Sequence, residues 1–156
     1  KGYLELAYRT PAVKAINAKA VYESELSHFD FQYGSNAYIR HRPDFTSIGD
    51  KGALVAAYCV VTLSGGGEVF HVVGGDEIGR AREASKGSAH PKNPWNTDPE
   101  SMWVKTAVRR TLKLCPLSNE LATAITKDEQ AEYGEQDNTE VFGDSEIING
   151  EFTESE

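Results

Sequence analysis

Four basic residues share one side of the segment that runs from about residue 97 to residue 115. At 100° per residue, Lys105, Arg109, Lys113 and Arg110 fall within an arc of about 140° on a helix. Arg and Lys side chains mounted on a rigid helix can neutralise phosphates along a nucleic-acid strand without reading its bases. The pattern therefore predicts a phosphate-binding helix face, and the alternative is a basic face that is solvated or paired with acids.

The opposite side of this helix is apolar and is expected to pack on a sheet. It contains Val104, Ala107, Val108, Thr111, Leu112, Leu114 and Cys115. The helix is predicted to start either with a capping box of Thr97 and Glu100 or with Asp98 as the cap before Pro99. It is predicted to end before Pro116. One face then seats the helix, and the cationic face stays open to phosphates.

Further candidate contacts lie outside this helix. Arg40 and Arg42 point to one side of a short predicted strand, and Lys86 and Lys92 lie in a polar loop. All four either extend a track of phosphate contacts or are ordinary surface charge. Trp95 lies in the same loop, where it either wedges against a base or anchors the loop on the core.

An alternating segment from residue 28 to residue 33 places three aromatic side chains on one face of a predicted strand. Phe29, Phe31 and Tyr33 could stack unpaired bases, since every base has a π face. The strand also needs a buried face, and these three residues supply it. We therefore interpret the stripe as core rather than as a stacking surface.

The remaining patterns predict an α+β fold, with a mainly antiparallel sheet of hairpins or a meander packed against helices. Strands are expected at residues 18–22, 28–33, 37–41, 53–63 and 68–73, with a turn at 64–67. Helices are expected at residues 2–9, from an Asp76 cap to about 85, at 97–115, and at 119–133. Residues 1–121 form the predicted domain, and residues 122–156 form a helical end and a disordered acidic tail.

Charge is distributed unevenly along the chain, which has a net charge of −8. Residues 1–116 hold 15 Lys and Arg against 12 Asp and Glu, whereas residues 117–156 hold one Lys against 12 acids. A weakly basic domain therefore precedes an acidic tail. The tail either competes with a nucleic acid for the basic helix face or solubilises the end of the chain.

Two further features indicate the setting of the chain. Cys59 and Cys115 lie in apolar runs and are read as buried thiols, which favours a reducing compartment. No apolar run approaches the roughly 20 residues that span a bilayer, and no signal peptide opens the chain, so we expect a cytoplasmic protein without membrane contact. The chain starts at Lys1 inside a helical pattern, so we expect it to begin partway through a larger protein.

Patterns typical of metal, cofactor or covalent chemistry are missing from the sequence. The four His and two Cys show no metal-ligand spacing, and Ser64 to Gly67 lacks the Lys-Ser or Lys-Thr of a P-loop. No Ser or Cys stands in a recognisable nucleophile context. We therefore expect no cofactor and no catalytic residue. The rival readings are a Mg²⁺-dependent DNA-processing enzyme and a protein-interaction module without DNA affinity.

Several segments, in order, resemble the RecT and Redβ group of phage single-strand annealing proteins. They are GYLELAYR at 2–9, AINA at 15–18, FQYG at 31–34, LSGG at 63–66, DEI at 76–78, ASK at 84–86, PW at 94–95, Met102, KTAVRR at 105–110 and LCPLS at 114–118. They span residues 1 to about 121. The family's upstream half has no counterpart in this sequence, and the acidic tail matches no family motif.

The resemblance implies a protein that binds single-stranded DNA and anneals complementary strands without ATP. It implies an annealed duplex intermediate, self-association into rings or filaments, and a partner exonuclease. It also implies that the cations of residues 105–110 lie along a DNA groove, with Lys113 in the same stretch. The implied work is binding and not catalysis.

Overall fold

The protein is described by a computed structural model that covers residues 2–46 and 49–134. Three antiparallel strands form the main sheet in the order β1-β4-β5. They are β1 (Val13–Tyr22), β4 (Leu54–Leu63) and β5 (Glu68–Gly74). A separate antiparallel pair, β2 (Phe29–Gln32) and β3 (Tyr38–His41), forms a hairpin. The α+β class and the antiparallel pairing predicted from the sequence are confirmed.

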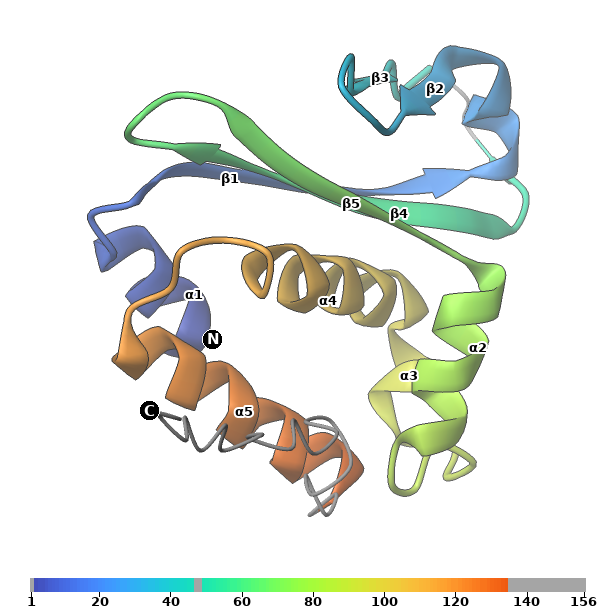
Figure 1. Cartoon of the computed structure of the whole chain (residues 1–156). Coiled ribbons are helices and arrows are strands. Elements are labelled where there is room, and N and C mark those ends of the chain that lie inside the picture. The colour runs from blue at the N-terminus through green and yellow to red at the C-terminus, as the bar shows by residue number, and fades with distance from the viewer. Residues whose placement is uncertain (1, 47–48, 135–156) are drawn as a thin grey trace, which may run out of the picture.

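The α-helices lie on one side of the main sheet, and the β2–β3 hairpin and the short helix that precedes it stand over the other face (Figure 1). The helical elements are α1 (Gly2–Arg9), the 3-10 helix η1 (Glu23–His28), α2 (Gly75–Ala84), α3 (Pro94–Thr97), α4 (Pro99–Leu112) and α5 (Asn119–Tyr133). Helix α4 packs along the sheet, and α5 lies beyond α4 and beside α1 (Figure 1). The fold therefore has the layers hairpin, sheet, α4, and α1 with α5.

The main core lies between the sheet and α4. Alternate residues of β4, among them Ala57, Cys59 and Val61, point to this side and are fully buried. Helix α4 contributes Ala107 and Leu112, which are also fully buried. The expected apolar side of α4 is confirmed except at Leu114, which follows the helix and is 60% exposed. Its backbone has left the helical path, so the helical wheel no longer gives its direction.

Most predicted elements occur, with shifted ends. Strand β1 begins at Val13, five residues before the expected start, because residues 13–17 continue the pairing with β4. Asp98 is the cap of α4, and its Oδ1 accepts the Ser101 N–H at 3.3 Å, which confirms the second of the two expected starts. The Asp76 cap is wrong, because Gly74 holds the cap position of α2 and Asp76 lies in the first turn. Residues 135–156 of the predicted tail lie outside the described residues.

Both cysteines are buried as expected, and burial governs their chemistry. Burial raises the pKa of the Cys59 thiol to about 12 and also raises the pKa of Cys115. The thiolate is the reactive form, so at pH 8 both thiols are expected to react slowly with a disulfide reagent in the folded chain and fully after denaturation. Thiol titration by absorbance measures this. Rapid stoichiometric labelling of folded chain would contradict the burial.

Two absences concern the described part of the chain only. None of its helices combines the length and apolar character needed to cross a membrane. Across residues 2–46 and 49–134, no group of three or more His, Cys, Asp or Glu is placed to hold a metal ion.

Candidate nucleic-acid interface

Helix α4 and its C-cap residue Lys113 carry three of the four predicted cations on one line. Lys105, Arg109 and Lys113 are spaced four residues apart, so they lie one above another on the helix surface. We call these three residues the cationic stripe. The stripe faces away from the sheet, as the sequence predicted, because the opposite side of α4 is buried in the core.

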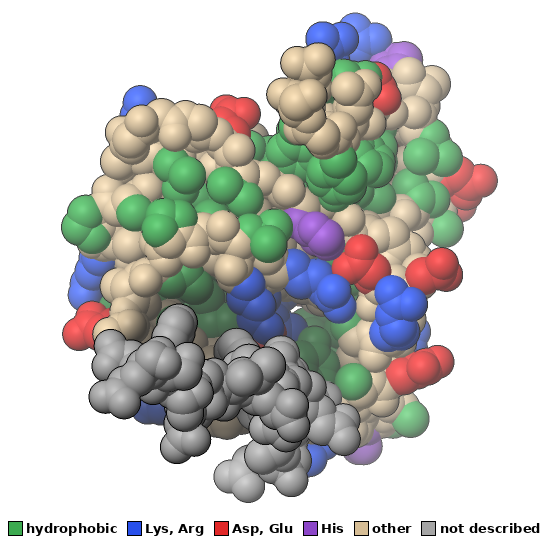
Figure 2. All heavy atoms as spheres, in the orientation of Figure 1, with side chains coloured by type: hydrophobic (Ala, Val, Ile, Leu, Met, Phe, Trp, Pro, Cys, Tyr) green, Lys and Arg blue, Asp and Glu red, His purple; other side chains and the backbone are tan. Residues whose placement is uncertain are grey.

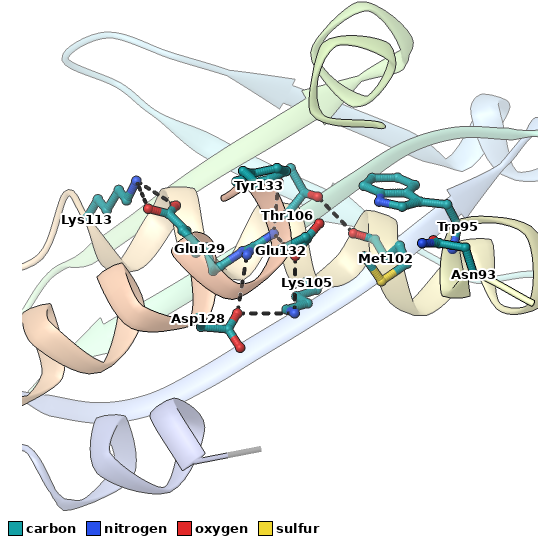
Figure 3. Close-up of polar contacts among 11 residues, drawn as sticks. Asn93, Trp95, Met102, Lys105, Thr106, Lys113, Asp128, Glu129, Glu132 and Tyr133 are labelled. Carbon is teal, nitrogen blue, oxygen red and sulfur yellow. Dashed lines mark hydrogen bonds and ion pairs between the residues drawn. The ribbon is translucent and has the colours of Figure 1, made fainter. Parts of the chain in front are cut away.

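Helix α5 lies over the cationic stripe and buries Arg109, while the Lys105 and Lys113 side chains stay 30% and 51% exposed. The expectation that the whole stripe lies open is therefore wrong. Asp128, Glu129 and Glu132, which we call the acidic face of α5, point at the stripe (Figure 3). Lys105 Nζ lies 3.1 Å from Asp128 Oδ2 and 3.3 Å from Glu132 Oε2. Lys113 Nζ lies 2.6 Å from Glu129 Oε1. Each cation of the stripe therefore has a carboxylate partner on α5.

Arg109 is the most deeply placed member of the stripe. Its side chain is 2% exposed, and its guanidinium lies 3.2 Å from Asp128 Oδ2 and 2.9 Å from Glu132 Oε2. It also donates to the Tyr133 hydroxyl at 3.0 Å. Burial lowers the pKa of Arg109, but Tyr133 and the two carboxylates outweigh it and leave the pKa raised. Arg109 is therefore a buried, charged and fully partnered group.

Arg110 leaves the stripe and points to a different neighbour. Its Nη1 lies 2.9 Å from Glu77 Oε2 of α2, and the Arg110 side chain is 42% exposed. The same Glu77 oxygen lies 3.3 Å from His71 Nε2 on β5. Arg110 therefore lies at the surface where α2, α4 and β5 meet.

A cavity of about 620 Å³ separates α5 from α4 and α2. One part of it is lined by Arg80 of α2, by Arg109 and Arg110 of α4, and by Lys113 at the C-cap of α4. The facing residues on α5 are Thr126, Glu129, Gln130 and Tyr133. The lining holds four cations, of which Arg109, Arg110 and Lys113 are each paired with a carboxylate of α5 or α2. We call it the basic cavity, because Arg and Lys side chains of this kind suit a phosphate group.

The β2–β3 hairpin presents aromatic rings beside the open face of the sheet. Phe29 stacks on Tyr58 of β4 at 6.0 Å between ring centroids and is half-buried. Phe31 and Tyr33 are 38% and 50% exposed, and the Tyr33 ring stacks on Phe70 of β5 at 5.3 Å. We call Phe31, Tyr33 and Phe70 the aromatic ledge. The core interpretation of the stripe is right for Phe29 and wrong for Phe31 and Tyr33.

Two polar contacts fix the hairpin on the sheet. The Tyr33 hydroxyl accepts the Val72 N–H of the edge strand at 2.8 Å. His41 of β3 joins Glu25 at 3.1 Å through Nε2 and the Tyr58 hydroxyl at 3.1 Å through Nδ1. Both His41 and Glu25 are almost completely buried. The rings of the ledge are therefore held in place by partners on η1, β4 and β5.

The aromatic ledge leads into the basic cavity. His71 connects them, because its ring lies 6.5 Å from the Tyr33 ring and it also lines the cavity. Figure 2 shows the same order on the surface, with hydrophobic side chains below the hairpin, then a His, then a group of Lys and Arg. Aromatic faces followed by cations are the two components that hold unpaired bases and their phosphates.

The other predicted contacts are scattered. Trp95 is 2% exposed in the core, which favours the anchoring reading, and it does not reach a base in this conformation. Arg40 and Arg42 are exposed on the hairpin, with Arg40 over the Tyr38 ring at 4.8 Å. Lys86 and Lys92 are exposed in the loop before α3. In the part of the chain that the structure describes, none of these five residues is part of the lining of the basic cavity. Their DNA contacts stay predictions.

Three residues of the candidate interface were not singled out from the sequence as contacts. Arg80, His71 and Glu77 lie on α2 and β5, and only the packing of these elements against α4 brings them to Arg110. The acidic face of α5 had a readable signal. Asp128, Glu129 and Glu132 share one side of the helix at helical spacing, as the cations do on α4.

Comparison with known proteins places this geometry in context. A sequence model of the RecT family matches residues 1–142. The protein named RecT from Escherichia coli strain K12 is 31% identical over 153 residues, which is 98% of this chain and 52% of that relative. The chain therefore spans about half the length of the curated relative that it matches.

Proposed function

Given that the chain belongs to the RecT family, we propose that it binds single-stranded DNA and takes part in annealing complementary strands without ATP. The observation that carries the proposal is the aromatic ledge running into the basic cavity. Phe31, Tyr33 and Phe70 offer ring faces, and Arg80 and Arg110 offer charge beside them.

The two surfaces suit one strand in a definite way. A base that stacks on Phe31 or Tyr33 uses its π face, so its pairing edge stays free for a complementary strand. Phosphates next to that base meet Arg110 and Arg80, which attract backbone of any sequence. This arrangement favours annealing, because it holds a strand extended without covering the edges that pair. It breaks no bond and requires no nucleotide cofactor.

Partners beyond DNA are part of the same proposal. The family resemblance implies that subunits assemble into rings or filaments and that an exonuclease works beside them. In a row of subunits, the aromatic ledges of neighbouring copies would form one continuous surface, which would hold a longer stretch of the strand. The annealed duplex is then the product that the assembly releases.

Removing the ring of Phe31 is expected to weaken binding of a labelled single-stranded oligonucleotide. Stacking contributes about 1 to 3 kcal/mol per base, which corresponds to a dissociation constant raised roughly 5-fold to 150-fold in Phe31→Ala. Fluorescence anisotropy across a salt series measures the change. The loss should persist at high salt, because stacking is not screened as phosphate contacts are.

Phe45→Ala is the matched control. Phe45 is 87% exposed and lies in the loop after β3, outside the aromatic ledge. An equal loss of affinity in both variants would show that the effect is general hydrophobicity and not the ledge. Unchanged affinity in Phe31→Ala, with wild-type chain binding, would remove the ledge from the proposal.

Two rival functions are separated by simple assays. A Mg²⁺-dependent DNA-processing enzyme would shorten a labelled oligonucleotide when Mg²⁺ is added, whereas an annealing protein leaves its length unchanged. A protein-interaction module would give no anisotropy change at any salt concentration. A fluorescence-quenching assay with two complementary oligonucleotides tests annealing itself.

A further inference from the structure

Helix α5 is attached to the rest of the protein in two different ways along its length. In its first half, Leu121 and Ile125 are almost fully buried and join the main core beside α1. In its second half, Asp128, Glu129 and Glu132 reach α4 through ion pairs. The first half is therefore held by apolar packing and the second half by charge.

The second half of α5 contacts α4 through polar groups and leaves a cavity beside these contacts. The cavity of about 620 Å³ lies between them, with Gln130 and Tyr133 on one side and Thr106 and Arg109 on the other. Beyond the ion pairs, the end of α5 is fixed by the bond from Lys86 N–H to the Glu132 carbonyl at 3.0 Å and by the bond from Arg109 to the Tyr133 hydroxyl at 3.0 Å. Movement of this half would break polar contacts and leave the apolar attachment at Leu121 and Ile125 in place.

The acidic face of α5 occupies the positions that a phosphate backbone would take on the cationic stripe. Carboxylates and phosphates are both acceptors for Arg and Lys in the same charge-assisted bonds. Arg109 is 2% exposed beneath the acidic face and cannot meet a strand while α5 is docked. Exchange of carboxylate for phosphate would keep Arg109 paired, so the exchange avoids leaving a buried charge alone.

We propose that the second half of α5 is a built-in competitor for DNA, which releases Lys105, Arg109 and Lys113 when a strand enters the basic cavity. This inference rests on the proposed function, because the displacing ligand is the backbone of single-stranded DNA. The chain then has two modes of binding. The ledge and Arg110 capture a strand first, and the cationic stripe holds it after α5 has moved.

Two measurable consequences follow from an internal competitor. The apparent affinity for DNA equals the intrinsic affinity multiplied by the fraction of chains in which α5 is displaced. Weakening the acidic face increases that fraction and should therefore raise the affinity. Salt weakens the α4–α5 ion pairs as well as the phosphate contacts, so the two effects oppose each other in the wild-type chain. Neutralising the acidic face removes the first effect, and the salt dependence of DNA binding should become steeper by up to about 0.7 per released cation.

The variant that tests this is Asp128→Asn, Glu129→Gln, Glu132→Gln in the full chain. Its control is Glu5→Gln, Glu83→Gln, Glu120→Gln, which removes the same charge from exposed acids outside the contact. Anisotropy with an oligothymidine strand should show about tenfold tighter binding and a steeper salt slope in the first variant only. Equal gains in both variants would reduce the effect to net charge and overturn the proposal.

Hydrogen exchange on the wild-type chain gives a second test that needs no folded variant. With the oligothymidine bound, amides of residues 126–133 should exchange faster than in the free chain, while amides of α4 become better protected. If DNA binds and α5 stays as protected as before, the competitor is overturned and the proposed function stands. If neither the wild-type chain nor either variant binds DNA, both proposals fail.

Discussion

Replacing Arg109 with methionine is expected to lower the free energy of unfolding by about 3 to 5 kcal/mol, the usual result of removing one partner of a buried ion pair. Methionine fills similar apolar space, so the loss comes from charge. Asp128 and Glu132 lose the cation that lies 3.2 and 2.9 Å away, although Lys105 stays within reach of both. Chemical denaturation of the full chain measures the change.

Lys105→Met is the matched control for this prediction. Lys105 contacts the same two carboxylates, but its side chain is 30% exposed, so its loss is expected to lower the free energy of unfolding by only about 0 to 1 kcal/mol. Adding Glu132→Gln to Arg109→Met should recover part of the stability, because one uncompensated carboxylate is removed. Equal losses in the two single variants would contradict the special burial of Arg109.

The stability lost in Arg109→Met comes from removing the guanidinium, and it does not prevent α5 from moving in the wild-type chain. The Arg109→Met substitution leaves carboxylates without their cation, whereas displacement of α5 by DNA gives Arg109 a phosphate in place of Glu132. A large effect of Arg109→Met is therefore compatible with a small free-energy difference between the docked and the DNA-bound positions of α5. The two experiments measure different quantities.

Local patterns predicted the elements of the fold well. The apolar run with its glycine turn gave β4 and β5, and the Asp98-Pro99 pair gave the first turn of α4. The elements that were missed, η1 and α3, are short and have too few residues for a periodic pattern. A helix as short as α3 gives no periodic pattern from which the burial of Trp95 could be predicted.

The state of the cationic stripe could not be read from α4 alone. A helical wheel gives the direction of Lys105, Arg109 and Lys113, and that direction is right. It does not say which element lies opposite, because the partner comes from α5, about 20 residues later and after the chain turns back in residues 113–118. The acidic face of α5 has the same helical spacing as the cationic stripe, and treating the two as complementary surfaces predicts their contact.

The aromatic residues show a similar division. Alternation placed Phe29, Phe31 and Tyr33 on one face, and the ring contacts between successive members confirm it. The sequence did not show that the hairpin is a two-stranded piece separate from the main sheet. Phe29 stacks on Tyr58 and is half-buried, whereas Phe31 and Tyr33 stay exposed although Tyr33 stacks on Phe70.

Loss of the Glu25 carboxylate is expected to destabilise the hairpin that carries these rings. The Glu25 side chain is 3% exposed and accepts the N–H groups of Tyr22 and Asp44, each at 3.1 Å, as well as contacting His41. Glu25→Ala removes the buried carboxylate that these part-buried donors and His41 contact, which should lower the free energy of unfolding by about 3 kcal/mol. Denaturant melts measure the global loss, and hydrogen exchange of residues 29–41 locates it.

The same carboxylate gives this loss a pH dependence of known sign. Burial alone raises the pKa of Glu25, but the two N–H groups and His41 outweigh it, so the pKa is lowered on folding. A lowered pKa stabilises the fold above the unfolded value of about 4.3 and loses that stabilisation as the pH falls through the folded pKa. The stability gap between wild-type chain and Glu25→Ala should therefore narrow at acidic pH.

Asp30→Ala on the same hairpin separates the buried anchor from hairpin acids in general. Asp30 accepts the exposed Tyr38 hydroxyl at 2.7 Å, so its loss is expected to lower the free energy of unfolding by less than about 1 kcal/mol. If Glu25→Ala loses DNA affinity together with hairpin protection while Asp30→Ala keeps both, the anchor positions the aromatic ledge. If Glu25→Ala instead loses hairpin protection but keeps full DNA affinity, the aromatic ledge does not hold the DNA strand.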